Sequence, residues 1–376
     1  MSKLVIYCPN CAFKTTAGRR PLRCPNCNGS LEYTNIPPFA PDLIDSTQPG
    51  HWRYAAMMPM VGEGKHRITL GEGWTPLLDG NWQGRAVYWK YDARMPTGSY
   101  RDRGMSTLIN WLVKHDVTVV MNDSSGNAGA SLACYASRAG IEECTIYVPE
   151  STPTPKKAQI SVYGASLVEV PGPRHEATNA AVAATRYNKE SAYASHAWHP
   201  AFLFGQMTCA WEIWEQLGRK VPDWIITPLG YGTTIVGLWR GFQHLQQAGL
   251  IDILPRMVAV QAEPYTPIYD AFHNGWSSTR PSVRIESIRA DGIEISNPIR
   301  AESAIRAIRS SEGTVVSVND DEVHDAWQKL AYKGLFVEPT SATVAAAISQ
   351  IATLMEPSDI VVPLLTAHGL KKPPEL

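Results

Sequence analysis

The feature of this 376-residue chain that most constrains its fold is a repeated alternation of short β-branched runs with Ala-rich helical stretches. The three clearest pairs are 117–121 with 128–139, 144–148 with 155–163, and 166–170 with 176–187. Further strand-like runs follow at 224–228, 257–261, 314–318 and 361–365. Strands that alternate with helices at this spacing predict an α/β protein with a doubly wound parallel sheet, in which ligands bind at the carboxyl ends of strands.

Composition narrows the class of protein. The chain is 44% hydrophobic and 18% charged, which suits a well-cored chain of two or three domains. Its formal net charge is -1 and it has no basic run, so nucleic acid is not expected as a partner. The first twenty residues lack a signal-type apolar core, and we expect a cytoplasmic protein with no membrane partner.

Four of the seven cysteines form two Cys-x2-Cys pairs near the start of the chain, Cys8 with Cys11 and Cys24 with Cys27. Two such knuckles supply four thiolates to one tetrahedral ion, which lets a segment with a minimal core fold. The pattern predicts a structural zinc ribbon. Disulfides and a rubredoxin-like iron site are the alternatives; the spacing does not exclude iron, and a reducing cytosol disfavours disulfides.

Two loops have the composition of anion-binding sites. The segment 122–129 follows a predicted strand, and its hydroxyls and helix-start amides would suit a carboxylate. Its simpler interpretation is a helix cap with two glycines for the turn. The segment 229–237 is a Gly-rich turn that opens a helix, which suits an oxyanion. It lacks the Walker lysine and an acidic residue for a ribose, so nucleotide binding is disfavoured.

A compact turn at 94–100 leads into another predicted helix. Pro96 and Gly98 indicate a tight turn, and the amphipathic pattern runs from Gly104 through Leu112. Ser99 is placed to cap this helix. The stretch 36–60 is rich in proline with little periodicity and is interpreted as a linker.

Several segments together resemble the threonine synthases and other fold-type II pyridoxal phosphate enzymes. The turn at 96–104 is similar to their Pro-Thr-Gly-Ser-Phe-Lys-Asp-Arg-Gly element, and 70–77 to Leu-Gly-Glu-Gly-x-Thr-Pro-Leu. Four further segments resemble family motifs. The family's carboxylate loop is similar to 124–129 and its phosphate loop to 229–237. Its Glu-Pro-x-Ser-Ala segment is similar to 338–342, and its Thr-Gly-x-Gly-Leu-Lys ending to 366–371. The motifs occur in family order, and the resemblance covers nearly the whole chain, ribbon included. It implies the fold-type II architecture, an α/β protein with two doubly wound parallel-sheet domains.

The resemblance implies a set of site residues. It implies that Asn127 contacts the ring hydroxyl of the cofactor and that Thr366 faces the pyridine nitrogen. The phosphate would be held by Gly230, Tyr231, Gly232, Thr233 and Thr234. The implied substrate-binding residues are Ser99, Ser124, Ser125, Gly126 and Glu338. For Glu338, a cap on the following helix is the competing interpretation.

Arg101 stands where the family has the lysine that forms the Schiff base. A guanidinium stays protonated, so Arg101 cannot act as the nucleophile or the base. Three alternatives then remain for pyridoxal 5'-phosphate. It would be bound noncovalently, it would be bound covalently through another lysine such as Lys90, Lys156 or Lys157, or it would not be bound at all. Ordinary threonine synthesis from phosphohomoserine is therefore not expected.

Three interpretations remain open. The favoured one is a diverged enzyme acting on an amino acid or phosphorylated amino acid, because the phosphate, ring-nitrogen and carboxylate elements of the family pocket are all retained. Its reaction would be β/γ-elimination or replacement, since a hydroxyl at the ring nitrogen restrains the ring as an electron sink. The second is a catalytically silent protein that binds a phosphorylated ligand or serves as a regulatory subunit. The third is a deliberate substitution at Arg101. We expect a homodimer with a zinc ribbon at 1–35, a large cofactor domain of 50–100 and 210–376, and a small domain of 101–209.

Overall fold

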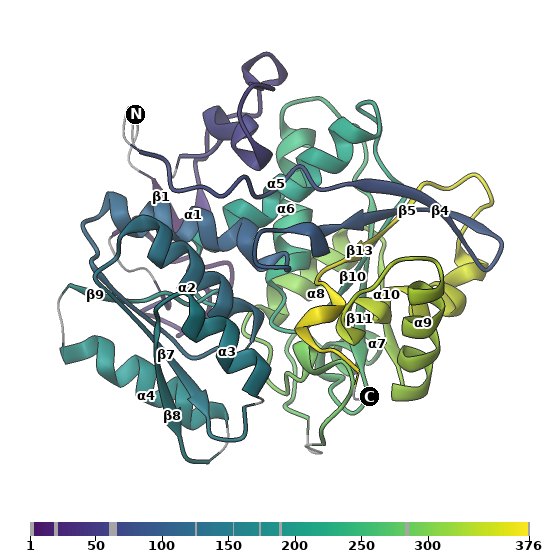
Figure 1. Ribbon diagram of the computed structural model, residues 1–376. Helices are drawn as coiled ribbons and strands as arrows, with labels where there is room; N and C mark the ends of the chain where they lie inside the picture. Colours follow the sequence, from purple (N-terminus) through teal and green to yellow (C-terminus); the bar gives the residue numbers. More distant parts are fainter. Residues whose placement is uncertain are drawn as a thin grey trace. The chain divides into compact units, whose positions relative to one another are not determined.

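A computed structural model describes residues 4–18, 22–59, 66–124, 126–152, 154–172, 174–187, 190–282 and 286–374. The chain divides into two compact units (Figure 1). Unit 1 contains Met1–Glu72 and Met95–Gly205, and unit 2 contains Gly73–Arg94 and Gln206–Leu376. In the described part of the chain, no helix combines the length and the apolar character needed to cross a membrane.

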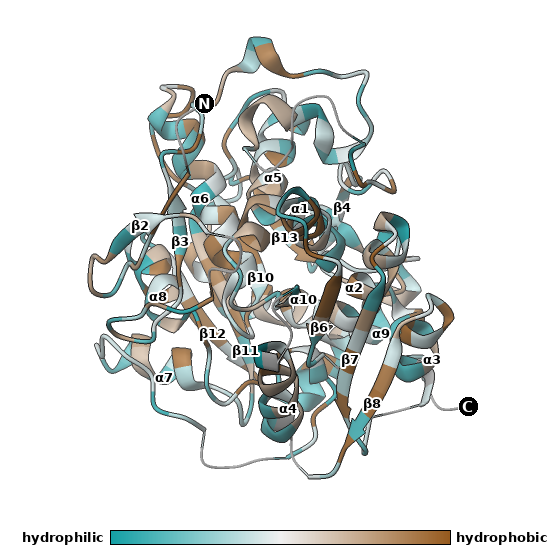
Figure 2. Ribbon diagram, turned by 90° about the vertical axis from the view of Figure 1, so that its left-hand side faces the viewer, coloured by the Kyte–Doolittle hydropathy of each residue, from teal (hydrophilic) through white to brown (hydrophobic). Residues whose placement is uncertain are grey.

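The sheet of unit 1 has four parallel strands in the order β8-β7-β6-β9. The strands are β6 (Val119–Asn122), β7 (Glu143–Pro149), β8 (Ser166–Val170) and β9 (Ser191–Tyr193), and the helices are α1 (Arg101–Lys114), α2 (Asn127–Ala139), α3 (Thr154–Val162) and α4 (Arg174–Tyr187). All four residues of the central strand β6 are buried, and Figure 2 shows this strand as hydrophobic. This sheet confirms the predicted strand–helix alternation.

A small three-stranded antiparallel sheet, in the order β2-β1-β3, forms the ribbon of unit 1. Its strands are β1 (Val5–Tyr7), β2 (Lys14–Thr16) and β3 (Glu32–Thr34). Among the described residues of this segment, the buried hydrophobic cluster consists of Ile6, Cys8, Cys24 and Leu31. Tyr33 on β3 packs its ring 5.6 Å from that of Trp111 on α1, so the ribbon is joined to the body of unit 1.

The stretch predicted as a linker is more ordered than expected. It contains the 3-10 helices η1 (Pro41–Leu43) and η2 (Gly50–Met57). His51, Trp52 and Tyr54 on η2 are fully buried. The linker interpretation is therefore wrong for η2, because these side chains are part of the core of unit 1.

The sheet of unit 2 has six strands in the order β12-β11-β10-β13-β5-β4. They are β4 (Leu77–Trp82), β5 (Arg85–Tyr91), β10 (Trp224–Pro228), β11 (Arg256–Ala262), β12 (Thr314–Val318) and β13 (Val361–Leu365). All neighbours are parallel except β4 and β5. The prediction of two parallel sheets is corrected here, because Gln83 and Gly84 both have positive φ and close a tight hairpin between β4 and β5.

The helices of unit 2 pack against this sheet. They are α6 (Thr233–Gln247), α7 (Pro267–His273), α8 (Ala301–Ser310), α9 (Asp320–Tyr332) and α10 (Pro339–Ile351), with short 3-10 turns η3 (Asp92–Arg94), η4 (Asp291–Ile293), η5 (Ala352–Leu354) and η6 (Gly369–Lys371). Helix α5 (Ala201–Gln216) begins in unit 1 and ends in unit 2. Gly237 lets α6 approach α5 closely, because a Cβ there would lie 2.2 Å from the Cβ of Gln206.

Candidate cofactor and substrate sites

In unit 2, the predicted phosphate loop runs directly from β10 into α6. Gly232 is the residue before the helix, has φ +93°, and offers no side chain to cap it. The first bond that closes a helical turn runs from Val236 N to Gly232 O at 3.1 Å. The amides of residues 233–235 therefore have no acceptor within the helix, and the positive end of its dipole adds to their attraction for an anion. Thr233 and Thr234 are buried at this helix start.

Two other segments of unit 2, far apart in the sequence, meet at Thr366. The hydroxyl of Ser341 lies 2.8 Å from the Thr366 hydroxyl. The Ser341 Oγ also accepts the backbone amides of Thr366 at 3.0 Å and Ala367 at 2.9 Å. The sequence analysis gave Ser341 no role, although it stands in the Glu-Pro-x-Ser-Ala segment. Only the fold brings it to the end of β13.

Glu338 belongs to the same group of residues through its backbone. Its amide donates to the carbonyl of Ala367 at 3.0 Å. Glu338 is the N-cap residue of α10 and is buried, but its carboxylate makes no capping hydrogen bond. The structure does not support the interpretation of this side chain as a helix cap.

In unit 1, the turn before α1 is held by Asp102. Its carboxylate accepts the Thr97 amide and hydroxyl, both at 2.7 Å, and the Ser131 hydroxyl at 2.6 Å. The prediction that Ser99 caps the helix is wrong. Tyr100 is the N-cap residue, and the buried Ser99 Oγ has no hydrogen-bond partner in the part of the chain that the structure describes.

Arg101 is the first residue of α1, which begins three residues earlier than its apolar pattern indicates. Its guanidinium carbon lies 4.2 Å from the centre of the Tyr100 ring. This is the geometry of a cation–π contact, which a planar, permanently charged group favours.

The predicted carboxylate loop leads into α2. Ala130 N donates to Gly126 O at 3.0 Å, so the amides of residues 127–129 precede the first bond within the helix. Gly129 is required here, because a Cβ would lie 2.3 Å from the carbonyl oxygen of Ser124. Ser124 and Gly126 flank position 125, and Ser125 itself lies outside the described residues. Asn127 is the first residue of the helix.

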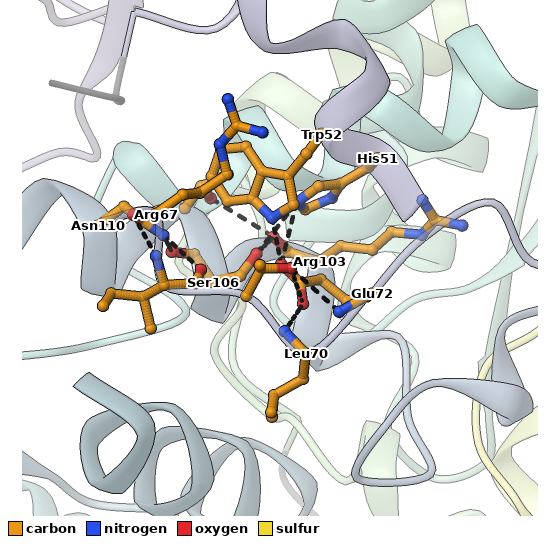
Figure 3. Close-up of polar contacts among 12 residues, drawn as sticks. His51, Trp52, Arg67, Leu70, Glu72, Arg103, Ser106 and Asn110 are labelled. Carbon is orange, nitrogen blue, oxygen red and sulfur yellow. Dashed lines mark hydrogen bonds and ion pairs between the residues drawn. The ribbon is translucent and has the colours of Figure 1, made fainter. Parts of the chain in front are cut away.

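Glu72, from the Leu-Gly-Glu-Gly segment, is the centre of a buried polar network in unit 1 (Figure 3). Its carboxylate accepts Trp52 Nε1 at 2.6 Å, Leu70 N at 2.8 Å and the Tyr135 hydroxyl at 2.8 Å. His51 Nε2 lies 3.4 Å away. Burial raises the pKa of Glu72, but the hydrogen bond and charge of His51 and the Leu70 amide outweigh burial and hold the pKa at about 2.

This network contains a serine, a histidine and a carboxylate, but it is not a catalytic triad. Ser106 Oγ and Glu72 Oε1 both approach the same nitrogen of His51, whereas a triad uses the two ring nitrogens separately. All three side chains are also fully buried. The sequence analysis gave Glu72 no role beyond its motif, and in the structure its carboxylate joins Trp52, Leu70 and Tyr135 within unit 1.

The three lysines considered as replacements for the missing amine have different surroundings. Lys90 is fully buried, and its Nζ donates to Thr75 O at 2.8 Å, Glu212 Oε2 at 2.8 Å and Gln216 Oε1 at 2.9 Å. Three acceptors use all three N–H groups of an ammonium. Lys90 is therefore held as a structural cation.

The other two lysines lie on α3. Lys157 binds Glu169 at 2.6 Å in a partly exposed ion pair. Lys156 lies beside the predicted carboxylate loop, since its Cδ is 3.9 Å from where a Cβ on Gly126 would be.

The four ribbon cysteines gather as predicted. Their Sγ atoms all lie within 4.8 Å of one another, and the pairs Cys8–Cys27 and Cys11–Cys24 are each 3.4 Å apart. Tetrahedral zinc with Zn–S bonds of about 2.3 Å requires sulfurs about 3.8 Å apart, so the cluster is compatible with the ion. The two knuckles have the same turn, because Ala12 N donates to Cys8 O and Asn28 N donates to Cys24 O.

The two α/β units and the open helix starts of α2 and α6 agree with a comparison of the sequence with known protein families. The family model described as "Pyridoxal-phosphate dependent enzyme" matches residues 68–367, and the chain belongs to this family.

Among its relatives, the threonine synthase of Methanocaldococcus jannaschii is 36% identical over 361 residues, covering 92% of this chain and 88% of the relative. The threonine synthase of Methanosarcina acetivorans is 32% identical over 380 residues, covering 98% and 92%. Among solved structures, a T.th. threonine deaminase has a TM-score of 0.66 at 22% identity, covering 78% of this chain and 92% of that one. This last likeness shows the shared α/β fold.

Proposed function

We propose that the protein binds pyridoxal phosphate without a covalent bond to Arg101 and acts on an amino acid or a phosphorylated amino acid. When bound, this cofactor withdraws electrons from the α-carbon of an amino acid. The family membership and the threonine synthase relatives support the class of chemistry. The reaction type proposed is β- or γ-elimination or replacement.

The observation that carries this proposal is the buried hydroxyl pair of Thr366 and Ser341 in unit 2. If the Thr366 hydroxyl faced the pyridine nitrogen of the bound cofactor, it would leave that nitrogen unprotonated, because an alcohol is far too weak an acid to protonate pyridine. The cofactor would then supply a weaker electron sink, which suits elimination better than transamination.

The residues of unit 2 fit the phosphate of this cofactor. The amides at the start of α6 and the hydroxyls of Thr233 and Thr234 would hold it, with Gly230, Tyr231 and Gly232 forming the preceding turn. In unit 1, we propose that Ser124, Ser125 and Gly126 bind the substrate carboxylate, Asn127 the ring hydroxyl and Ser99 the substrate. The buried Ser99 Oγ, which lacks a partner among the described residues, supports a ligand at that position. Glu338 is proposed as a further substrate contact.

The alternative is a silent protein that binds a phosphorylated ligand or serves as a regulatory subunit. Its support is the chemistry of the cations already described: Arg101 cannot supply a neutral amine, and Lys90 is fixed by three acceptors. The four cysteines are proposed to hold one structural zinc ion in either case, and a cytoplasmic homodimer remains our expectation.

The two proposals are separated by exchange of the α-proton. The protein is incubated with pyridoxal phosphate in D2O, together with a panel of amino acids and phosphorylated amino acids, and proton NMR follows the α-position. An enzyme exchanges or consumes at least one compound well above the rate of free cofactor. Cofactor binding without exchange of any compound would support the silent protein.

A further inference from the structure

We infer that Ser341 is a positioning residue that sets the direction of the Thr366 hydroxyl proton. This inference rests on the proposed function, in which Thr366 faces the ring nitrogen. It concerns a single side chain of α10 that is fully buried.

The argument is a count of donors and acceptors. A serine hydroxyl has one proton to donate and two lone pairs that accept. The two lone pairs of Ser341 are used by the amides of Thr366 at 3.0 Å and Ala367 at 2.9 Å. Ser341 therefore has no remaining lone pair with which to accept the proton of Thr366.

The proton of Ser341 has two possible acceptors. Thr366 Oγ1 lies 2.8 Å away, the usual distance between hydrogen-bonded hydroxyls, whereas Ala367 O lies 3.3 Å away. Ser341 thus donates to Thr366. The proton of Thr366 then points away from Ser341 and is available to an acceptor such as an unprotonated pyridine nitrogen.

The test compares the affinity for pyridoxal phosphate with that for its 1-deaza analogue, which has a C–H group in place of the ring nitrogen. The wild type should prefer pyridoxal phosphate about fivefold, the factor expected of one hydrogen bond between neutral groups. Ser341→Ala should abolish the preference. Ser341→Cys, which is close in shape but a weak donor, should reduce it, and Ser341→Thr should retain it.

Thr343→Val is the matched control, because Thr343 is a buried residue on the same helix whose hydroxyl, within the described part of the chain, donates to Thr340 O. It should keep the preference. An unchanged preference in Ser341→Ala, or in Ser341→Cys if the alanine variant does not fold, would overturn the inference. Binding of neither compound by the wild type would instead contradict the proposed function.

Discussion

Trp52 donates from Nε1 to the Glu72 carboxylate at 2.6 Å, and this buried bond connects a helix in the predicted linker to the Leu-Gly-Glu-Gly segment. Neither residue is proposed to touch a ligand. The contact indicates that Glu72, a residue of the motif that resembles threonine synthases, serves folding rather than ligand binding.

We predict that Glu72→Gln lowers the free energy of unfolding by about 3 kcal/mol or more, because it removes the buried charge that pairs with His51 and accepts from Trp52 and Tyr135. Denaturant titration measures the change. Glu169→Gln is the control, since its ion pair with Lys157 is partly exposed and should be worth less than about 1 kcal/mol. Equal effects of the two variants would contradict a structural role for Glu72.

The same carboxylate predicts a dependence of stability on acid. The pKa of Glu72 is about 2 in the folded state and 4.5 for the unpaired group. Its contribution is therefore complete above about pH 4.5 and is lost as the pH falls towards 2, a total of about 3 kcal/mol. Between pH 5 and pH 2, the free energy of unfolding should fall less for Glu72→Gln than for wild type. If both proteins lost the same free energy over this range, groups other than Glu72 would cause the acid sensitivity.

For the ribbon, we predict one zinc ion per chain, bound by Cys8, Cys11, Cys24 and Cys27. Because the buried hydrophobic cluster in the described part of this segment is small, chelation should unfold it. Metal analysis should find no zinc in Cys8→Ser and full zinc in Cys144→Ser, a cysteine outside the cluster. Full zinc content in Cys8→Ser would remove this prediction.

For the loop before α6, we predict that pyridoxal phosphate raises the thermal midpoint far more than pyridoxal does. Ligand at about 100 times its Kd stabilises the native state by about 3 kcal/mol. Gly232→Asp should abolish the difference by placing a negative charge at the helix start. Gly249→Asp is the matched control, because Gly249 also has positive φ and lies beyond the other end of α6. Equal shifts from the two compounds would count against a phosphate site.

Much of the fold is predictable from the sequence because it depends on local periodicity. The strands at 224–228, 314–318 and 361–365 have the predicted bounds, and the apolar runs of unit 1 are all strands or helices. Features that depend on distant partners were missed. The burial of Trp52 depends on Glu72, twenty residues away, and the β4–β5 hairpin depends on positive φ at Gln83, a residue with no strong turn preference.

In the candidate site, too, residues recognisable from local sequence were predicted and residues that depend on distant contacts were not. The glycines and hydroxyls of the loops before α2 and α6 could be named from composition and motif order. Ser341 could not be, because its importance arises from a contact with Thr366, twenty-five residues later. Ser99 was given a capping role because its residue type favours caps, but the helix begins at Arg101 with Tyr100 as its N-cap.

The central claim is that the cofactor is bound without a covalent bond because Arg101 cannot provide an amine. Borohydride reduction with pyridoxal phosphate, followed by peptide mass mapping, tests it most directly. We predict no adduct in wild type or Arg101→Gln and an adduct at position 101 in Arg101→Lys. An adduct on another lysine of the wild type, such as Lys156, would contradict the claim. No adduct in Arg101→Lys would show that the pocket does not support the family chemistry and would favour the silent protein.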